Sequence, residues 1–111
     1  MFVNCYKITS LDVSNFNTEK VEDMSYMFLG CNKLKNIDVS NFSTKNVRTM
    51  KYMFSNCFEL TTIDLYNFET DKVEDMSYMF NFCTNLINLK SPYFNTQNVI
   101  DMSYMFNGCN N

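Results

Sequence analysis

Apolar and polar positions follow one pattern along the whole chain, and the pattern repeats every 26 residues. The segments 23–28, 49–54, 75–80 and 101–106 read DMSYMF, TMKYMF, DMSYMF and DMSYMF, with no insertion between them that would shift the register. A fixed period of roughly 20 to 50 residues is typical of repeat proteins, whose units stack and share a core. The pattern therefore predicts a solenoid.

The boundaries of the repeats follow from the cysteines. With Cys as the first position, the repeats cover 5–30, 31–56, 57–82 and 83–108, and a partial fifth begins at 109. Their shared pattern is CxxLxxIDVSNFxTxxVxDMSYMFxx. One such unit is too small to bury its own apolar side chains, whereas stacking places each column against its equivalents. We expect a single solenoid domain over residues 1–111.

Each repeat is predicted to contain a short strand. In the second repeat, Ile37 and Val39 alternate with Asn36, Asp38 and Ser40, as in a half-buried strand. Ser and Asn after this segment favour a turn. We expect equivalent strands of successive repeats to form a parallel sheet.

A short helix is predicted in the second half of each repeat. Thr49, like the Asp at its equivalents, is a suitable N-cap, and Met50, Met53 and Phe54 are spaced to form one inward face. A helix of under two turns would depend on the stack for its stability. A left-handed residue would then end the helix, which suits Gly30, Asn56 and Gly108. Phe82 stands at the equivalent position of the third repeat, and there we expect the chain to leave the helix in a different backbone conformation.

The two predicted elements have different spacings. Strands pair about 4.8 Å apart, whereas packed helices lie about 8 to 10 Å apart. This mismatch predicts a curved stack with strands on the concave side and helices on the convex side. The outward strand positions would then line a concave binding face.

Each repeat combines the strand pattern LxxIxV, the Phe that follows it, the Val, the Met-Phe pair and the Cys three positions before the next Leu. Together these features resemble the leucine-rich repeats of the BspA-like bacterial surface protein family. The resemblance extends over essentially the whole chain. It implies an α/β repeat, a right-handed leucine-rich-repeat solenoid. It also implies a secreted or surface-attached adhesin-type protein that binds host matrix proteins or other cells.

Composition and charge narrow the function classes. The net charge of −3 without a basic cluster disfavours nucleic acid and anionic lipid as partners. No apolar run approaches the roughly 18 residues of a membrane span. No secretory signal or anchor is recognisable, so a cytoplasmic location stays open beside the cell surface. The chain has no His and only two Gly, and it contains no nucleophile motif or phosphate-binding loop, so we expect no enzyme activity and no cofactor.

Two sulfur columns admit a chemical interpretation. Stacking would bring neighbouring cysteines within disulfide range, but the odd number of cysteines and the fit of one buried small residue in each repeat favour a column without bonds. That column contains Cys5, Cys31, Cys57, Cys83 and Cys109. Met24, Met27 and Cys31 offer soft ligands for Cu(I), but their spacing fits a core. Zinc is disfavoured because His and CxxC pairs are absent, and we predict no metal site.

Two further columns are the candidate ligand-binding residues. The first is the carboxylate row of Asp12, Asp38 and Asp64, in which Lys90 takes the fourth place and could pair with Asp64. Its alternatives are a ligand site and an ordinary solvated or turn-bonding row; Ca²⁺ would need more oxygens. The second column is Tyr26, Tyr52, Tyr78 and Tyr104, expected to point away from the core. These tyrosines could anchor a protein partner or pack on one another.

The leading functional hypothesis is a non-catalytic protein-interaction module within a bacterial cell-surface adhesin-type protein. Repeat proteins of this kind supply extended surfaces for other macromolecules. One alternative is a structural spacer or truncated repeat remnant, whose open end strands would favour end-to-end self-association. Another is an intracellular leucine-rich-repeat scaffold, in which five cysteines stay reduced.

Overall fold

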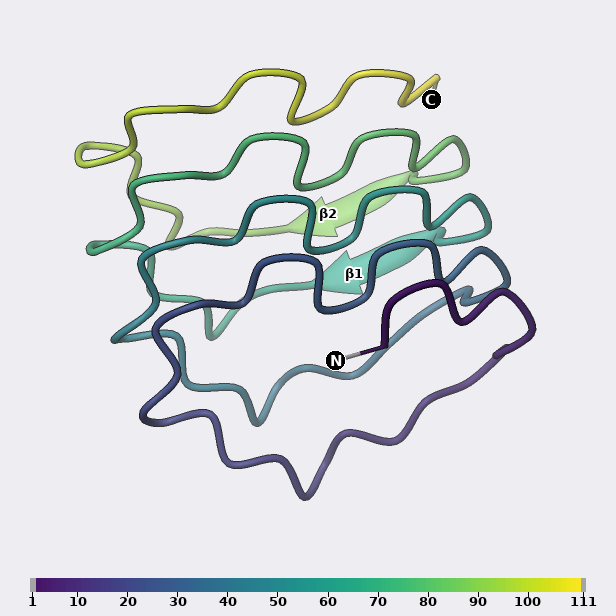
Figure 1. Cartoon of the computed structure of the whole chain (residues 1–111), viewed down its shortest axis with the longest axis horizontal. Coiled ribbons are helices and arrows are strands. Elements are labelled where there is room, and N and C mark those ends of the chain that lie inside the picture. Colours follow the sequence, from purple (N-terminus) through teal and green to yellow (C-terminus); the bar gives the residue numbers. More distant parts are fainter. Residues whose placement is uncertain (1, 111) are drawn as a thin grey trace.

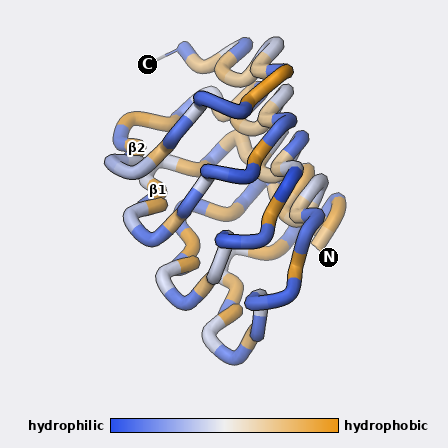
Figure 2. Tube along the Cα trace, turned by 90° about the vertical axis from the view of Figure 1, so that its left-hand side faces the viewer, coloured by the Kyte–Doolittle hydropathy of each residue, from blue (hydrophilic) through white to orange (hydrophobic). Residues whose placement is uncertain are grey.

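The computed structural model describes residues 2–110 and shows the chain winding through a stack of similar coils (Figure 1). Parallel bridges join Asp23 to Thr49, Thr49 to Asp75, and Asp75 to Asp101, and each pair is 26 residues apart. Hydrophilic and hydrophobic stretches recur at matching places from coil to coil (Figure 2). The sequence period is therefore the length of one coil.

Strands form in only two of the coils within residues 2–110. They are β1 (Thr62–Asp64) and β2 (Asn88–Lys90), which pair in parallel with Ile63 opposite Leu89. Ile63 is buried between exposed neighbours, as the alternation predicts. The first two coils contain no strand, so the prediction of one strand in every repeat is wrong there.

The predicted helices are also absent: no residue of 2–110 lies in a helix, and so none there could cross a membrane. The α/β leucine-rich-repeat solenoid with helices on its convex side is therefore contradicted. An α-helix needs each amide to bond four residues back along its own chain. Here alternate amides bond the next coil instead, from Met24 N to Thr49 O at 3.0 Å and from Tyr26 N to Lys51 O at 2.9 Å.

The residue expected to cap a helix closes a turn instead. Asp23 Oδ1 accepts the Ser25 amide at 2.7 Å, and the same bond recurs at Asp75 and Asp101. The residue three positions after this Asp is a Tyr in every repeat and has a left-handed backbone, with φ of 62° at Tyr26 and 58° at Tyr78. Since a left-handed residue cannot continue a right-handed helix, the chain turns here and its amides face the adjacent coil.

Aromatic and sulfur side chains fill the interior as columns. Phe28 stacks on Phe54 at 5.3 Å between ring centroids, and Phe54 stacks on Phe80 at 5.5 Å. Met50 and Met53 are fully buried beside them, so the inward direction predicted for the Met–Met–Phe face is confirmed although the helix is not. Spacing of i, i+3 and i+4 thus brings side chains to one interior through turns as well as through a helix.

A threonine column ties the coils together, and its role was not anticipated from the sequence. The buried Thr44 hydroxyl donates to Glu69 O at 2.9 Å and accepts from Glu69 N at 2.8 Å. Thr18 and Thr70 make the same reciprocal pair of bonds with Ser43 and Asn95. One side chain therefore satisfies two backbone groups of the next coil.

The exit after each Met-Phe segment is left-handed in all four coils. The φ angles are 73° at Gly30, 60° at Asn56, 56° at Phe82 and 74° at Gly108. The prediction of a different exit at Phe82 is therefore wrong. The bonds between coils impose one backbone path, and Phe82 follows it despite its large side chain.

Candidate functional site

The carboxylate row lies on the strand-side face, which we define as the exposed outward positions of the strand segments and of their equivalents in the first two coils. Asp12, Asp38 and Asp64 take equivalent places on successive coils, and all three are exposed. Each Oδ1 accepts a backbone amide two residues later at 2.9 Å, from Ser14, Ser40 and Tyr66 respectively. The turn-bonding interpretation of this row is thereby confirmed.

The same hydrogen bonds affect ionisation. Bonds from the side chain and then the backbone of Ser14 lower the pKa of Asp12, and Ser40 lowers the pKa of Asp38 in the same way. The charge of Asp12 opposes this shift at Asp38 to a smaller degree. Both carboxylates are therefore ionised at neutral pH.

The predicted ion pair between Lys90 and Asp64 is present. Lys90 Nζ lies 3.7 Å from Asp64 Oδ2, across the β1–β2 pair. Both side chains are more than half exposed, so the pair adds little stability. It leaves Asp12 and Asp38 as the carboxylates of the row that have no cation partner within residues 2–110.

A shallow hollow of about 400 Å³ follows the middle of the row. It is lined by Asn36, Ile37, Asp38, Ser40, Thr62 and Asp64. Its polar groups are carboxylates, hydroxyls and an amide, and it is open to solvent. Within the described part of the chain, no three His, Cys, Asp or Glu side chains converge as a metal site would require.

The tyrosine column forms a stack on another part of the coils. Ring centroids lie 5.2 Å apart for Tyr26 and Tyr52, 4.4 Å for Tyr52 and Tyr78, and 4.9 Å for Tyr78 and Tyr104. Of the two interpretations, mutual packing is thus confirmed. Desolvation, followed by the neighbouring tyrosines, raises the pKa of Tyr78.

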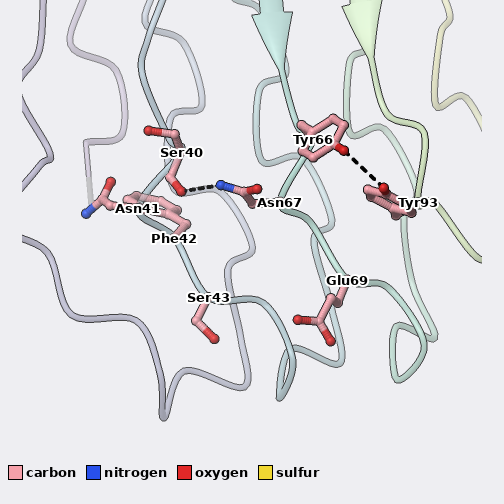
Figure 3. Close-up of a pocket in the computed structure, with 8 residues that line it drawn as sticks. All are labelled: Ser40, Asn41, Phe42, Ser43, Tyr66, Asn67, Glu69 and Tyr93. Carbon is pink, nitrogen blue, oxygen red and sulfur yellow. Dashed lines mark hydrogen bonds between the residues drawn. The ribbon is translucent and has the colours of Figure 1, made fainter.

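A second hollow, of about 500 Å³, was not predicted (Figure 3). Tyr66 and Tyr93 form one side of it; their hydroxyls are 3.1 Å apart and their rings meet at 76°. Glu69 also lines the hollow and lies below this pair in the view of Figure 3. The signal in the sequence was a local break in the repeat, because Tyr66 and Tyr93 stand in columns that hold Ser and Asn in the preceding coils.

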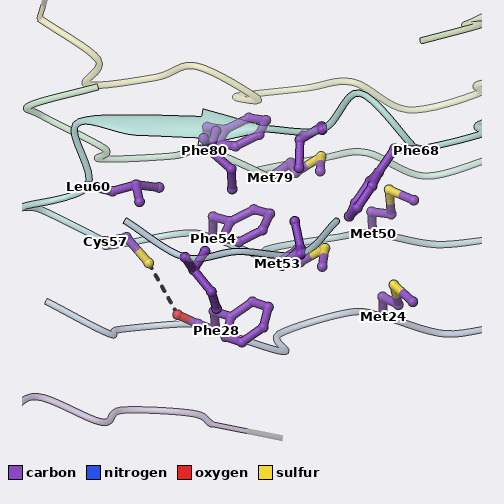
Figure 4. Packing of buried hydrophobic residues seen from close by; sticks show 14 of the residues in the cluster. Met24, Phe28, Met50, Met53, Phe54, Cys57, Leu60, Phe68, Met79 and Phe80 are labelled. Atoms are coloured by element: carbon purple, nitrogen blue, oxygen red, sulfur yellow. Dashed lines mark hydrogen bonds between the residues drawn. The ribbon is translucent and has the colours of Figure 1, made fainter. Parts of the chain in front are cut away.

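The cysteine column contains thiols and no disulfide: all five cysteines are free. Cys57 Sγ donates to Phe28 O at 3.3 Å (Figure 4). Cys83 Sγ donates to Phe54 O at 3.1 Å in the same way. Burial raises the pKa of Cys31 to about 11 and that of Cys83 to about 12. These cysteines act as small interior residues that bond the preceding coil.

Comparisons with known proteins identify a family without a described activity. No curated protein and no solved structure matches the chain. The model of one family, described as "Mycoplasma protein of unknown function, DUF285", matches residues 1–111. Because this match covers the whole sequence, the chain belongs to the DUF285 family.

Proposed function

We propose that the chain is a non-catalytic protein-interaction module, within a bacterial cell-surface adhesin-type protein, that binds its partner through the strand-side face. One observation carries the proposal: exposed carboxylates lie in a row on this face, two of them, Asp38 and Asp64, line an open hollow, and an uncharged acceptor could also close their turns. Closing the turn needs only an acceptor such as Asp38 Oδ1, which an amide oxygen would also supply.

The charge of this row suits recognition of a partner. Exposed charges contribute mainly to the rate and specificity of association, because they select a surface of complementary sign. Asp12 and Asp38 are free to interact with cationic side chains of a partner, whereas Asp64 already faces Lys90. The resemblance of the repeat to BspA-like proteins supports a host matrix or cell-surface protein as that partner.

Binding to immobilised fibronectin and laminin tests the proposal. The variant Asp12→Asn/Asp38→Asn/Asp64→Asn keeps the turn-closing acceptors and removes only the charge. We expect about threefold to tenfold weaker binding to the recognised protein, since each exposed ion pair contributes little.

A matched control is available within the same coils. Asp23→Asn/Asp75→Asn/Asp101→Asn changes the net charge equally in turns of the same kind, away from the strand-side face. Binding should be retained in this control. Equal loss in both variants, or unchanged binding in the first, would contradict a role for the strand-side face.

The exposed surface of the last coil supports a second candidate function, that of a structural spacer. In the third coil the amides of Met76, Tyr78 and Phe80 donate to the fourth, but the equivalent amides of Met102 and Phe106 have no acceptor within residues 2–110. Met102 and Phe106 are each 49% exposed, against 0% for Met76 and Phe80. Such a surface suits stacking with another coil of the same pattern.

Sedimentation velocity over a range of concentrations distinguishes the spacer. Self-association that Met102→Lys abolishes would support stacking at this surface. A protein that stays monomeric at every concentration would contradict self-association.

A further inference from the structure

Three departures from the repeat occur together around the hollow of Figure 3. Tyr66 replaces the Ser of the first two coils, Tyr93 replaces the Asn of the first three, and Glu69 replaces Asn or Ser. The columns concerned are Ser14, Ser40, Tyr66, Pro92; then Asn15, Asn41, Asn67, Tyr93; then Asn17, Ser43, Glu69, Asn95. The departures lie on adjacent coils, so they produce one local site.

Tyr93 lacks the side-chain hydrogen bonds that an Asn in the same column makes to the preceding coil. In the equivalent place, the Asn41 amide donates to the carbonyls of Val13, Ser14 and Phe16 at 3.2, 2.9 and 3.2 Å. A tyrosine cannot make these bonds. Tyr93 gains one hydroxyl hydrogen bond and an edge-on ring contact with Tyr66. The two side chains are still 57% and 53% exposed, so these contacts bury little of their rings.

Glu69 also lacks the hydrogen bond that an Asn in its column accepts from the amide two residues later. In its column, Asn17 Oδ1 accepts the Glu19 amide at 3.1 Å, and Asn95 Oδ1 accepts the Gln97 amide at 2.9 Å. Glu69 makes no such bond. Positions that break a local rule with little structural gain are characteristic of functional sites.

The electrostatics of the hollow indicate the charge of its ligand. No Lys or Arg is among its lining residues. The cations of the described chain that form ion pairs do so with Glu19, Glu22, Glu59, Asp64 and Glu74. Within residues 2–110, the exposed carboxylate of Glu69 has no cation partner, while its backbone is held by Thr44. A carboxylate that lines the same hollow as two aromatic rings favours a cation.

We propose that the hollow formed by Tyr66, Tyr93 and Glu69 binds an arginine side chain of the partner protein. The planar guanidinium group of arginine can stack on an aromatic face and also pair with a carboxylate. It is less strongly hydrated than the ammonium group of lysine, so it loses less on leaving water. A neutral sugar could stack on the rings, but it would leave the charge of Glu69 without a role. This inference rests on the proposed function, since it assigns one contact of the protein partner.

The test uses the whole chain and two short peptides. Acetyl-Gly-Arg-Gly-amide is titrated into ¹⁵N-labelled protein and followed by NMR, with acetyl-Gly-citrulline-Gly-amide as an uncharged control of the same shape. We expect shifts at Tyr66, Tyr93 and Glu69, and about fivefold weaker binding of the citrulline peptide. Equal binding of both peptides, or stronger binding of a neutral oligosaccharide at these residues, would overturn the proposal.

The matched variant restores the repeat. Tyr66→Ser/Glu69→Asn/Tyr93→Asn contains only residues found in the same columns of other coils, so it is expected to fold and to unfold at a higher temperature than the wild type. Arginine-peptide binding should be lost in this variant. A lower unfolding temperature would show a structural role for the three residues and overturn the proposal. If binding to the matrix protein persists in this variant and no arginine-dependent shifts occur in the wild type, only the present inference fails.

Discussion

A Cβ atom on Gly108 would lie 2.4 Å from Cδ1 and 2.8 Å from Cε1 of Phe82, the residue at the same position one coil earlier. Both residues are left-handed, with φ of 74° and 56°. The missing side chain of Gly108 therefore makes room for the Phe82 ring. Phe82 in turn holds a backbone conformation that usually suits Gly or Asn.

Replacing Gly108 by Ala should lower the free energy of unfolding by about 1 to 3 kcal/mol, because it adds both left-handed strain and a clash with Phe82. Urea unfolding followed by circular dichroism measures the change. In a Phe82→Asn background the clash is removed, so the same substitution should cost less. Equal costs in both backgrounds would contradict this account of the contact.

Replacing Thr44 by Val should lower the free energy of unfolding by about 2 to 4 kcal/mol. The substitution removes two part-buried hydrogen bonds to Glu69 and leaves the N–H and carbonyl of that residue without this partner. Thr44→Ser retains the hydroxyl and should cost clearly less. If Ser and Val were equally destabilising in the same urea measurement, the methyl group rather than the hydroxyl would be responsible.

Acid should destabilise the protein through its turn-closing carboxylates. Hydrogen bonds from Ser14, Ser40 and Ser103 lower the folded-state pKa of Asp12, Asp38 and Asp101. A pKa that is lower in the folded state contributes stability above the unfolded value of about 3.9, and this contribution is lost as the pH falls through the folded pKa. The free energy of unfolding should therefore decrease below about pH 4.

A variant with Asn at Asp12, Asp38 and Asp101 is the control for this pH effect. It keeps the acceptor oxygens but cannot titrate, so its stability should vary less between neutral and acidic pH. Parallel pH profiles for the variant and the wild type would assign the acid sensitivity to other groups.

The interior thiols should resist modification in the folded protein. Burial raises the pKa of Cys31 and Cys83, and most strongly that of Cys57, so almost no thiolate is present at mildly alkaline pH. Only the half-buried Cys5 and Cys109 should react readily with Ellman's reagent. All five should react in concentrated urea. Rapid native-state reaction of Cys57, located by mass spectrometry, would contradict the buried column.

The candidate site could be predicted in part. The exposure of Asp12, Asp38 and Asp64 followed from alternation in the strand segments, and the Lys90–Asp64 pair followed from the register of the repeat. The hollow at Tyr66, Tyr93 and Glu69 could not be predicted from averaged columns, because it arises where individual residues depart from them.

The sequence alone determined the length of a coil and the columns that meet in its interior. The 26-residue period specifies which residues stack, and the apolar columns specify which side chains leave water. Only the tertiary structure decided the backbone of the DMSYMF segments, because Met–Met–Phe spacing suits a helix and a turning chain equally. The next coil offers an acceptor to every second amide, whereas an isolated helix of under two turns is not stable. Bonds between coils therefore replace the predicted helices.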